Sequence, residues 1–475
     1  MKKIIFCLLI TLSLLHSQDH SSMTGSAFIG STTIDGKNYQ QIGVMADIPI
    51  GKLGIGLDVK ISIDSNGDLR EEDWDDFEDY LNILRYVRWA TKNDPFYLKV
   101  GALTGVRFGQ GIVIDNYSNT IRYPDYKMIG LEGQVSFDKF RSEFFINNIK
   151  ESFEDKSSVV LGTRLSYNLI GGLYLGGSIV SDLNQYNGLL DSDGDSYPDK
   201  IDRYPHNKKL VTEIDKYEKA GVSEETINEL VSLGLLDGTR RETLFSKNDK
   251  RSEVTVFSGD ISYQFFNNKF VSLVTYGEFA KIVDNGWGFT APGVNANFGP
   301  INLYAEYRQS SDEFLFSYFD DTYELERSGC SLDENGDLYV ETKAESLSNV
   351  PKMKGYFLGA DFELFGIVDF YAGYQDLRNS DMNKRSIDAK LSLSKNLIPK
   401  ISKAWAYYVQ NNVENFKDIK TPSTVYGIVL GYNIGDGVSL DFNWRTTFDD
   451  INGNGKIDSR DEEIRSYGVS ASMTF

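Results

Sequence analysis

The chain has 475 residues, with 69 acidic and 49 basic side chains and a formal net charge of −20. This acidity argues against nucleic-acid binding, because phosphate recognition depends on basic patches. Tyrosine (28), phenylalanine (29) and glycine (43) are abundant while proline (10) is scarce. The mixture favours many strands with aromatic faces over a helical enzyme core.

The first residues have the pattern of an export signal. Lys2 and Lys3 form a positively charged start, residues 4–15 an apolar core, and residues 16–18 a cleavage zone. The apolar core is shorter than a membrane-spanning helix needs, which argues against the alternative of an uncleaved anchor. We therefore predict a signal peptide at 1–17 and a mature domain at 18–475.

Alternation with a period of two residues dominates the mature domain. At 53–63, 386–394, 424–433 and 437–445, apolar residues share one face and small or polar residues share the other. Most predicted strands are about nine to thirteen residues long, enough to cross a membrane at a tilt. Pro292 falls inside one of them, so we expect that strand to be shorter or bulged. The predicted strands are 24–33, 39–48, 53–63, 80–90, 96–103, 128–136, 141–149, 158–167, 173–182, 252–265, 270–281, 289–298, 301–309, 353–363, 366–376, 386–394, 400–411, 423–434, 437–447 and 463–475.

The connections alternate in length. Short turns follow the even-numbered strands, and the long segments 64–79, 104–127, 183–251, 310–352 and 448–462 follow odd-numbered ones. This parity predicts an all-β fold, a transmembrane antiparallel up-and-down β-barrel of about 20 strands (18–22), with short periplasmic turns and long extracellular loops. Because lipid cannot satisfy an open sheet edge, the first and last strands are expected to pair.

The last strand ends in a regular pattern. Tyr467, Val469, Ala471, Met473 and Phe475 share one face, opposite small polar residues. This strand resembles the insertion signal of bacterial outer-membrane β-barrels of the porin-like kind. The resemblance implies an outer-membrane location, contact with membrane lipid, and recognition of the strand by the barrel-assembly machinery.

One acidic motif lies in the segment 183–251. Asp191, Asp193, Asp195, Asp199 and Asp202 are spaced so that their carboxylates can converge on one cation, as calcium requires six to eight oxygens. The motif resembles a thrombospondin type 3 calcium repeat, although Ser196 stands where that family usually has glycine. The alternative is a solvated acidic turn.

A second motif lies at 450–461. It resembles an EF-hand or dockerin loop, with Lys456 offering only its backbone carbonyl and Asp461 replacing the usual long bidentate glutamate. Weaker Asn-Gly motifs at 64–68 and 333–337 are interpreted as plain turns. Calcium is thus the expected cofactor, in loops on one side of the barrel. The candidate ligands of the second motif are Asp450, Asn452, Asn454, Lys456, Asp458 and Asp461.

Helices are predicted within 183–251. Ser223 is a suitable N-cap for a helix at 223–236, and a second helix is possible at 208–219. The segment is either a surface cap or a loop that folds inward and narrows a pore. The sequence leaves both open.

Charged residues recur on the face opposite the apolar one. On the lipid face each would cost up to roughly 2–4 kcal/mol near the midplane, so we expect them to face the lumen. They fit either a watery channel or a salt-bridged wall. The residues expected to face the lumen are Asp58, Lys60, Arg164, Glu306, Arg308, Asp361, Asp369, Asp441 and Arg445.

Together these features favour a porin-like passive channel for small solutes. Barrels of 16–18 strands leave an aqueous lumen, whereas 22-strand transporters are plugged, and no plug-sized segment precedes the first predicted strand. The alternative is a surface adhesion or binding protein that uses the barrel as a membrane anchor. Catalysis is not expected, because His20 and His206 are the only histidines of the mature domain and neither suits a Ser-His-acid site.

Overall fold

The computed structural model describes residues 24–34, 37–70, 74, 83–121, 127–150, 159–205, 207–247, 250–332, 338–364, 366–393, 397–414, 416–417, 419–421, 423–435, 438–448, 457–460 and 462–474. The predicted signal peptide at 1–17 and the terminal Phe475 lie outside these residues. No helix of the described part is long and apolar enough to span a membrane.

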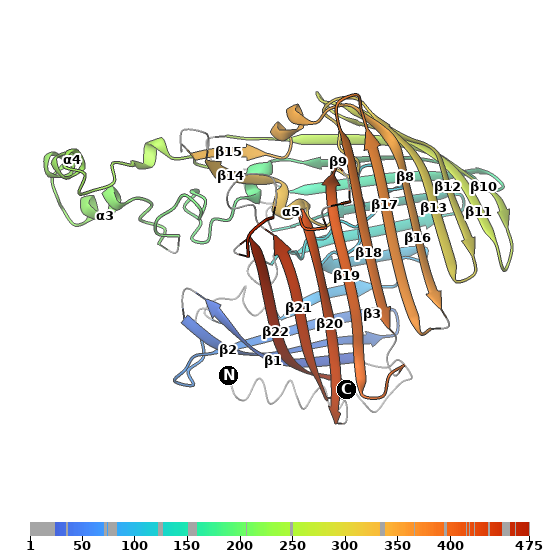
Figure 1. The fold of residues 1–475 in the computed structure, drawn as a ribbon, viewed down its shortest axis with the longest axis horizontal. Coiled ribbons are helices and arrows are strands. Elements are labelled where there is room, and N and C mark those ends of the chain that lie inside the picture. The colour runs from blue at the N-terminus through green and yellow to red at the C-terminus, as the bar shows by residue number, and fades with distance from the viewer. Residues whose placement is uncertain are drawn as a thin grey trace.

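The described chain is an antiparallel all-β structure with one sheet of 20 strands (Figure 1). Each strand pairs with the strand before it and the strand after it. In addition, β1 pairs with β22, with Ser26–Ile29 opposite 471–474, so the pairings form a ring. The strands of this sheet are β1 (Thr24–Ile34), β2 (Lys37–Ile50), β3 (Leu53–Ile63), β4 (Leu84–Trp89), β5 (Phe96–Gly101), β6 (Gly130–Phe137), β7 (Phe140–Ile146), β8 (Val160–Ile170), β9 (Leu173–Asp182), β10 (Val254–Asn267), β11 (Ser272–Ile282), β12 (Trp287–Phe298), β13 (Ile301–Ser310), β16 (Met353–Leu364), β17 (Val368–Arg378), β18 (Asn383–Leu393), β19 (Ile401–Val413), β20 (Thr424–Gly435), β21 (Val438–Phe448) and β22 (Glu463–Thr474).

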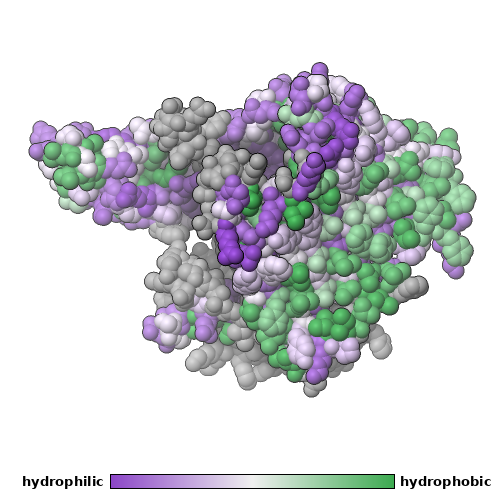
Figure 2. All heavy atoms as spheres, viewed as in Figure 1, coloured by the Kyte–Doolittle hydropathy of each residue, from purple (hydrophilic) through white to green (hydrophobic). Residues whose placement is uncertain are grey.

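The alternating sequence gives the sheet two different faces. On β21, Phe442 and Trp444 lie on the outer face and are 48% and 37% exposed. Asp441 of the same strand lies on the inner face and is 3% exposed. The same pattern recurs on most strands, because successive residues of a strand point to opposite faces. Figure 2 shows hydrophobic residues gathered over the outer face of the sheet and hydrophilic residues over the long connections. The ring therefore has an apolar exterior and a polar interior.

Glycines on the inner face lie under aromatic rings. A Cβ atom on any of these glycines would collide with a ring from a neighbouring position. Each ring therefore lies close against the wall, over a residue without a side chain. The pairs are Gly56 with Tyr86, Gly162 with Phe145, Gly293 with Tyr276, Gly359 with Tyr304 and Gly427 with Tyr407.

The connections follow the predicted parity. Turns of a few residues, such as 51–52, 138–139, 171–172 and 299–300, join strands at one end of the sheet. The connections 64–83, 102–129, 183–253, 311–352 and 449–462 join them at the other end. Strand order and antiparallel direction were therefore predictable, whereas several strand ends differ by a few residues.

Two local features of the sheet bear on the predictions, one expected and one not. The pairing of β12 with β13 shifts register between Thr290 and Gly293, where Pro292 cannot donate to the ladder, so this strand is bulged and not shortened. A small hairpin of β14 (Ser328–Leu332) and β15 (Leu338–Thr342) was not predicted. It lies inside the connection 311–352, for which the sequence predicted only a loop.

The connection 183–253 forms a lobe that projects away from the sheet (Figure 1). It contains the 3₁₀ turns η4 (Gln185–Gly188) and η5 (Arg241–Thr243) and the helices α3 (Glu213–Lys219) and α4 (Glu224–Ser232). Ser223 caps α4 as predicted, accepting a hydrogen bond from the Thr226 amide. Ile214, Ile227 and Leu236 form a small core of its own, so the helices of this lobe do not fold into the ring.

Candidate functional site

Two other connections fold back into the ring. Residues 102–121 and 311–327 lie against the inner face of the sheet, and we call them the infolded segments. Their side chains share one buried core with the wall strands β7 to β11. The core includes Leu103, Phe108, Ile114, Tyr117, Phe314, Phe319 and Tyr323 from the infolded segments, and Phe145, Val160, Val180, Val256 and Ile282 from the wall.

The infolded segments are joined to each other along their backbones. Ile114 and Phe319 form a parallel β-bridge. The Asp115 amide donates to the Phe319 carbonyl over 3.0 Å, and the Phe319 amide donates to the Val113 carbonyl over 3.0 Å. The two connections therefore form one unit inside the ring.

A carboxylate on the wall holds the first infolded segment. Glu278 of β11 is 3% exposed, and its Oε2 accepts the backbone N–H groups of Gln110 (3.1 Å) and Ile112 (3.2 Å). Gly109, directly before Gln110, has φ +59° and no room for a Cβ beside Glu278 and Arg164. A glycine is therefore required at this position for both conformation and space.

A buried charge network holds the second infolded segment. Arg327, which follows the short helix α5 (Tyr323–Glu326), pairs with Asp182 at 2.9 Å and with Glu324 at 3.0 Å. All three side chains are at most 2% exposed. Tyr323 donates to Asp182 over 2.8 Å, and Tyr117 donates to Glu324. The segment is thus attached to the end of β9 and to the other infolded segment.

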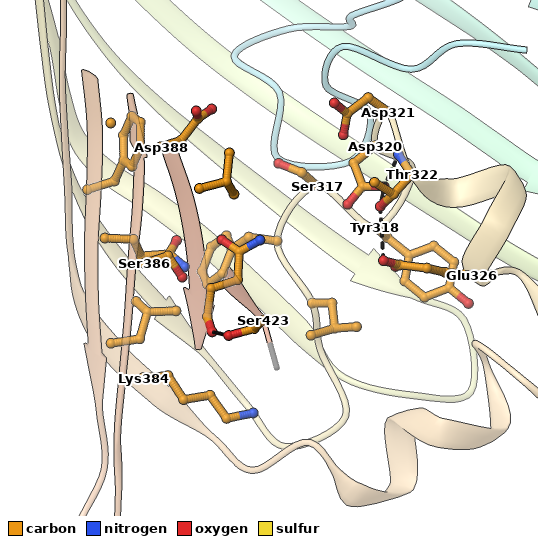
Figure 3. Close-up of a pocket in the computed structure, with 18 of the residues that line it drawn as sticks. Ser317, Tyr318, Asp320, Asp321, Thr322, Glu326, Lys384, Ser386, Asp388 and Ser423 are labelled. Carbon is orange, nitrogen blue, oxygen red and sulfur yellow. Dashed lines mark hydrogen bonds between the residues drawn. The ribbon is translucent and has the colours of Figure 1, made fainter. Parts of the chain in front are cut away.

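The infolded segments leave a cavity of about 820 Å³ beside them, which we call the vestibule. Its other wall is the inner face of β16 to β21. Figure 3 shows Tyr318, Asp320, Asp321 and Glu326 on the infolded side, and Lys384, Ser386 and Asp388 on the side of β18. A second cavity of about 520 Å³ lies between residues 107–110 and the wall near the turns 138–141.

The predicted lumen-facing charges lie on the inner face, and most have a polar partner there. Arg164 pairs with Asp260 at 2.6 Å, Arg308 with Glu306 at 2.6 Å, and Asp441 with Lys403 at 2.7 Å. Tyr304 donates to Asp361, and Ser392 to Asp369 over 3.3 Å. Asp58 and Lys60 of β3 also interact with other groups of the protein. Arg308 and Arg445 also line the vestibule, so this interior is partly a salt-bridged wall and partly a cavity lining.

The first acidic motif forms a compact loop in the projecting lobe. Oxygens of Asp191, Asp193 and Asp195 lie within 4.8 Å of one another. Asp191 accepts the amides of Gly194 (2.9 Å), Asp195 (3.2 Å) and Ser196 (3.0 Å), which winds the loop around its carboxylate.

Two further residues of this motif complete its geometry. Asp202 is 7% exposed, and its Oδ2 is buried without a hydrogen-bond partner, as are the Oδ2 atoms of Asp193 and Asp195. Burial, and then the charges of Asp195, Asp193 and Asp199, raises the pKa of Asp202 to about 6. Asp199 instead accepts the Ser192 amide and hydroxyl at 2.7 and 2.6 Å. Three carboxylates thus converge in the loop, and Asp202 lies close enough to be affected by their charge. With three buried carboxylate oxygens unpartnered, the loop offers the oxygen donors that a hard cation prefers.

Other predicted site residues are placed only in part. Asp450, Asn452, Asn454, Lys456 and Asp461 of the second motif lie outside the described residues, and the Asp458 amide donates to Glu462 over 2.9 Å. On β22, Tyr467 and Val469 are 72% and 60% exposed on the outer face. Ala471 and Met473 lie in the same strand at matching register.

No family model matches the chain, and no curated protein matches it. The chain is similar to the siderophore receptor PirA from Acinetobacter baumannii, with 10% identity, a TM-score of 0.35, and coverage of 97% of this chain and 81% of that one. It is similar to OccK10 (OpdN) from Pseudomonas aeruginosa (11% identity, TM-score 0.33, coverage 96% and 99%). It is also similar to a BenF-like porin from Pseudomonas fluorescens Pf-5 (12%, 0.33, coverage 95% and 97%).

Proposed function

We propose that the chain is an outer-membrane β-barrel that forms a passive, non-enzymatic channel for small solutes. The observation that carries this proposal is the contrast between the two faces of the 20-stranded ring. Its outer face exposes large apolar and aromatic side chains, such as Phe257, Leu430 and Trp444. Its inner face carries charges and a cavity, an arrangement suited to lipid outside and water inside.

The pairing of β1 with β22 supports the same proposal. A sheet in hydrocarbon must satisfy every backbone N–H and C=O group within the protein, and a ring of pairings does so without an edge strand. The short turns then face the periplasm and the long connections face outward. The vestibule is the outer part of the solute path, narrowed by the infolded segments.

Ion conductance in planar lipid bilayers tests the proposal. Protein purified from the outer-membrane fraction in detergent is expected to give stepwise current increases. Removal of the second infolded segment, by joining Ser310 to Met353 through a short Gly-Ser linker, is expected to raise the unit conductance. A protein that stays soluble without detergent, or one that inserts but carries no current in either form, contradicts the proposal.

We also propose that the loop at 191–202 binds calcium. The proposal is supported by the buried, unpartnered carboxylate oxygens of Asp193, Asp195 and Asp202, since calcium prefers such oxygen ligands. Terbium luminescence, with terbium as a calcium substitute and calcium as competitor, measures binding directly. Absence of sensitised emission at millimolar terbium contradicts the proposal.

A second candidate function is a surface-binding protein anchored by the barrel. The projecting lobe with its own small core favours it (Figure 1). In this case the lumen is sealed, and a partner binds the lobe in a calcium-dependent way. Conductance distinguishes the two functions, because a sealed barrel carries no current.

The outward Tyr467 and Val469 on the last strand support recognition of that strand by the barrel-assembly machinery. Deletion of Phe475 is expected to lower the amount of protein in the outer membrane while leaving export intact. Quantitative immunoblotting of membrane fractions tests this, and an unchanged amount contradicts it.

A further inference from the structure

The vestibule carries opposite charges at different depths. Near the connection end of β18, Lys384 points into the vestibule, and deeper on the same strand Asp388 does so (Figure 3). Asp321, on the second infolded segment, faces the same space from the other side. These three side chains place a cation near the mouth of the vestibule and two carboxylates further inside, where Arg445 also lines the cavity.

These charges are available to a ligand. Neighbouring acids of the infolded side are engaged: Glu326 pairs with Lys343 at 3.1 Å, and Asp320 accepts from Thr322 over 2.9 Å. Within the described residues, by contrast, Lys384, Asp388 and Asp321 take part in none of the ion pairs. Asp321 and Asp388 face one another across this space, and in the part of the chain that the structure describes the nearby Lys343 and Lys390 form no ion pair with them, although their charges reach these carboxylates. The two carboxylates therefore favour a cation between them, and Lys384 favours an anion.

The distance between the two ends follows from the strand. Lys384 and Asp388 are four residues apart on one face, which corresponds to about 13 Å along β18. An extended peptide spans up to about 3.3–3.6 Å per residue, so three or four residues match this separation. A single amino acid is too short to contact both ends.

The wall between the two ends suits an extended peptide. Ser386 lies midway between them on β18, and Asn411, Gln375 and Ser423 offer further hydrogen-bonding groups. Apolar side chains of neighbouring strands lie among these groups. Backbone amides of a peptide would find polar partners, and its side chains would find apolar contacts.

We propose that the vestibule binds short zwitterionic peptides of three or four residues, with the amino terminus between Asp321 and Asp388 and the carboxylate at Lys384. The proposal rests on the proposed channel function and names its solute class. It makes Lys384, Asp388 and Asp321 specificity-determining residues of the channel.

The test uses tetraalanine as a blocker of potassium current through the full-length protein in planar bilayers. Free tetraalanine is expected to reduce the current at lower concentration than either its N-acetylated or its C-amidated form. Asp388→Asn is expected to weaken the block by free tetraalanine about tenfold or more, the usual effect of losing a charged hydrogen bond. In Asp388→Asn, free and N-acetylated tetraalanine are then expected to block almost equally. In Lys384→Gln, free and C-amidated tetraalanine are expected to block almost equally.

Asp369→Asn is the matched control. It removes the same charge from the inner face, at a carboxylate that does not line the vestibule, and is expected to leave the block unchanged. Equal block by free and capped tetraalanine, or equal block of wild type and Asp388→Asn, overturns the peptide proposal while the channel function stands. If no current flows at all, the channel function fails, and binding of tetraalanine to the detergent-solubilised protein by calorimetry decides the peptide proposal separately.

Discussion

Replacement of Arg327 by methionine tests how the second infolded segment is held. The substitution keeps the length of the side chain and removes the guanidinium that pairs with Asp182 and Glu324. These two carboxylates are 0% and 1% exposed, so each would be left buried without its counter-ion. Breaking a buried pair in this way costs about 3–5 kcal/mol.

The strand pairing of the 20-stranded sheet does not depend on this contact. The lost free energy is therefore expected to destabilise the attachment of residues 311–327 to the wall. An energy of this size shifts the equilibrium between the attached and the detached segment at least about a hundredfold. Hydrogen–deuterium exchange in detergent is expected to show faster exchange of amides 311–327 with unchanged protection of the strands. Unit conductance is expected to rise, because the segment no longer narrows the path.

Arg378→Met is the matched control for this experiment. Arg378 is 50% exposed, and its partner Asp376 keeps a second pair with Arg385 at 3.1 Å, so the loss is expected to stay below about 1 kcal/mol. If Arg327→Met leaves both the exchange of 311–327 and the conductance at wild-type values, the buried network does not hold the segment and the reasoning is wrong.

Three further predictions concern other parts of the molecule. The folded pKa of Asp202, about 6, lies above its ordinary value of 3.8, so without calcium its stabilising contribution is fully present below about pH 4 and is lost as the pH rises through about 6. Calcium needs the ionised carboxylate, so the calcium affinity, measured by competition with terbium, is expected to increase as the pH rises through 6. The affinity is expected to be lower in Asp202→Asn but unchanged in the control Asp237→Asn. An affinity independent of pH between 5 and 7 would contradict this. Phe442→Lys places a charge on the outer face and is expected to destabilise the folded protein in lipid vesicles by about 2–4 kcal/mol in urea titrations, whereas Asn443→Lys on the inner face is expected to cost less than about 1 kcal/mol; equal effects would argue against a lipid-facing exterior. Gly109→Val is expected to displace the first infolded segment, because the position has φ +59° and no space for a side chain, and to increase unit conductance; unchanged conductance would show that this segment does not limit the path.

The strands of the sheet were largely predictable because their signal is local. Alternation of apolar and polar residues depends on the pleat alone, so β3, β18 and β21 lie close to their predicted ranges. The ends of β4 were not predictable in this way, since residues 80–90 alternate poorly. The bulge at Pro292 was foreseen from chemistry, because a proline cannot donate to the ladder.

The infolding of residues 102–121 and 311–327 was not predicted. For residues 183–251 the sequence left a surface cap and an inward loop open, and the structure has the surface cap. The helices at 213–232 project away from the sheet, while the infolded segments come from connections that were treated as plain loops. A signal was present: residues 112–114 are Ile-Val-Ile and residues 314–319 are Phe-Leu-Phe-Ser-Tyr-Phe. Such apolar runs are costly in an exposed loop, so they indicate burial, but the sequence does not say against which part of the wall.

The calcium motif shows the same division between local and distant information. The spacing of Asp191, Asp193 and Asp195 predicted that their carboxylates lie together, because the geometry of a tight turn depends only on residues close in sequence. The burial of Asp202 depends on how the lobe packs around it, which spacing does not report.

The glycines that lie under aromatic side chains affect the inner width of the closed sheet. A methyl group added at Gly427 or Gly359 would lift a tyrosine off the wall and push it toward the axis. The free cross-section for a passing molecule is thus set partly by residues that have no side chain. Single glycine-to-alanine changes could therefore tune which molecular sizes pass, without any change in strand number or charge.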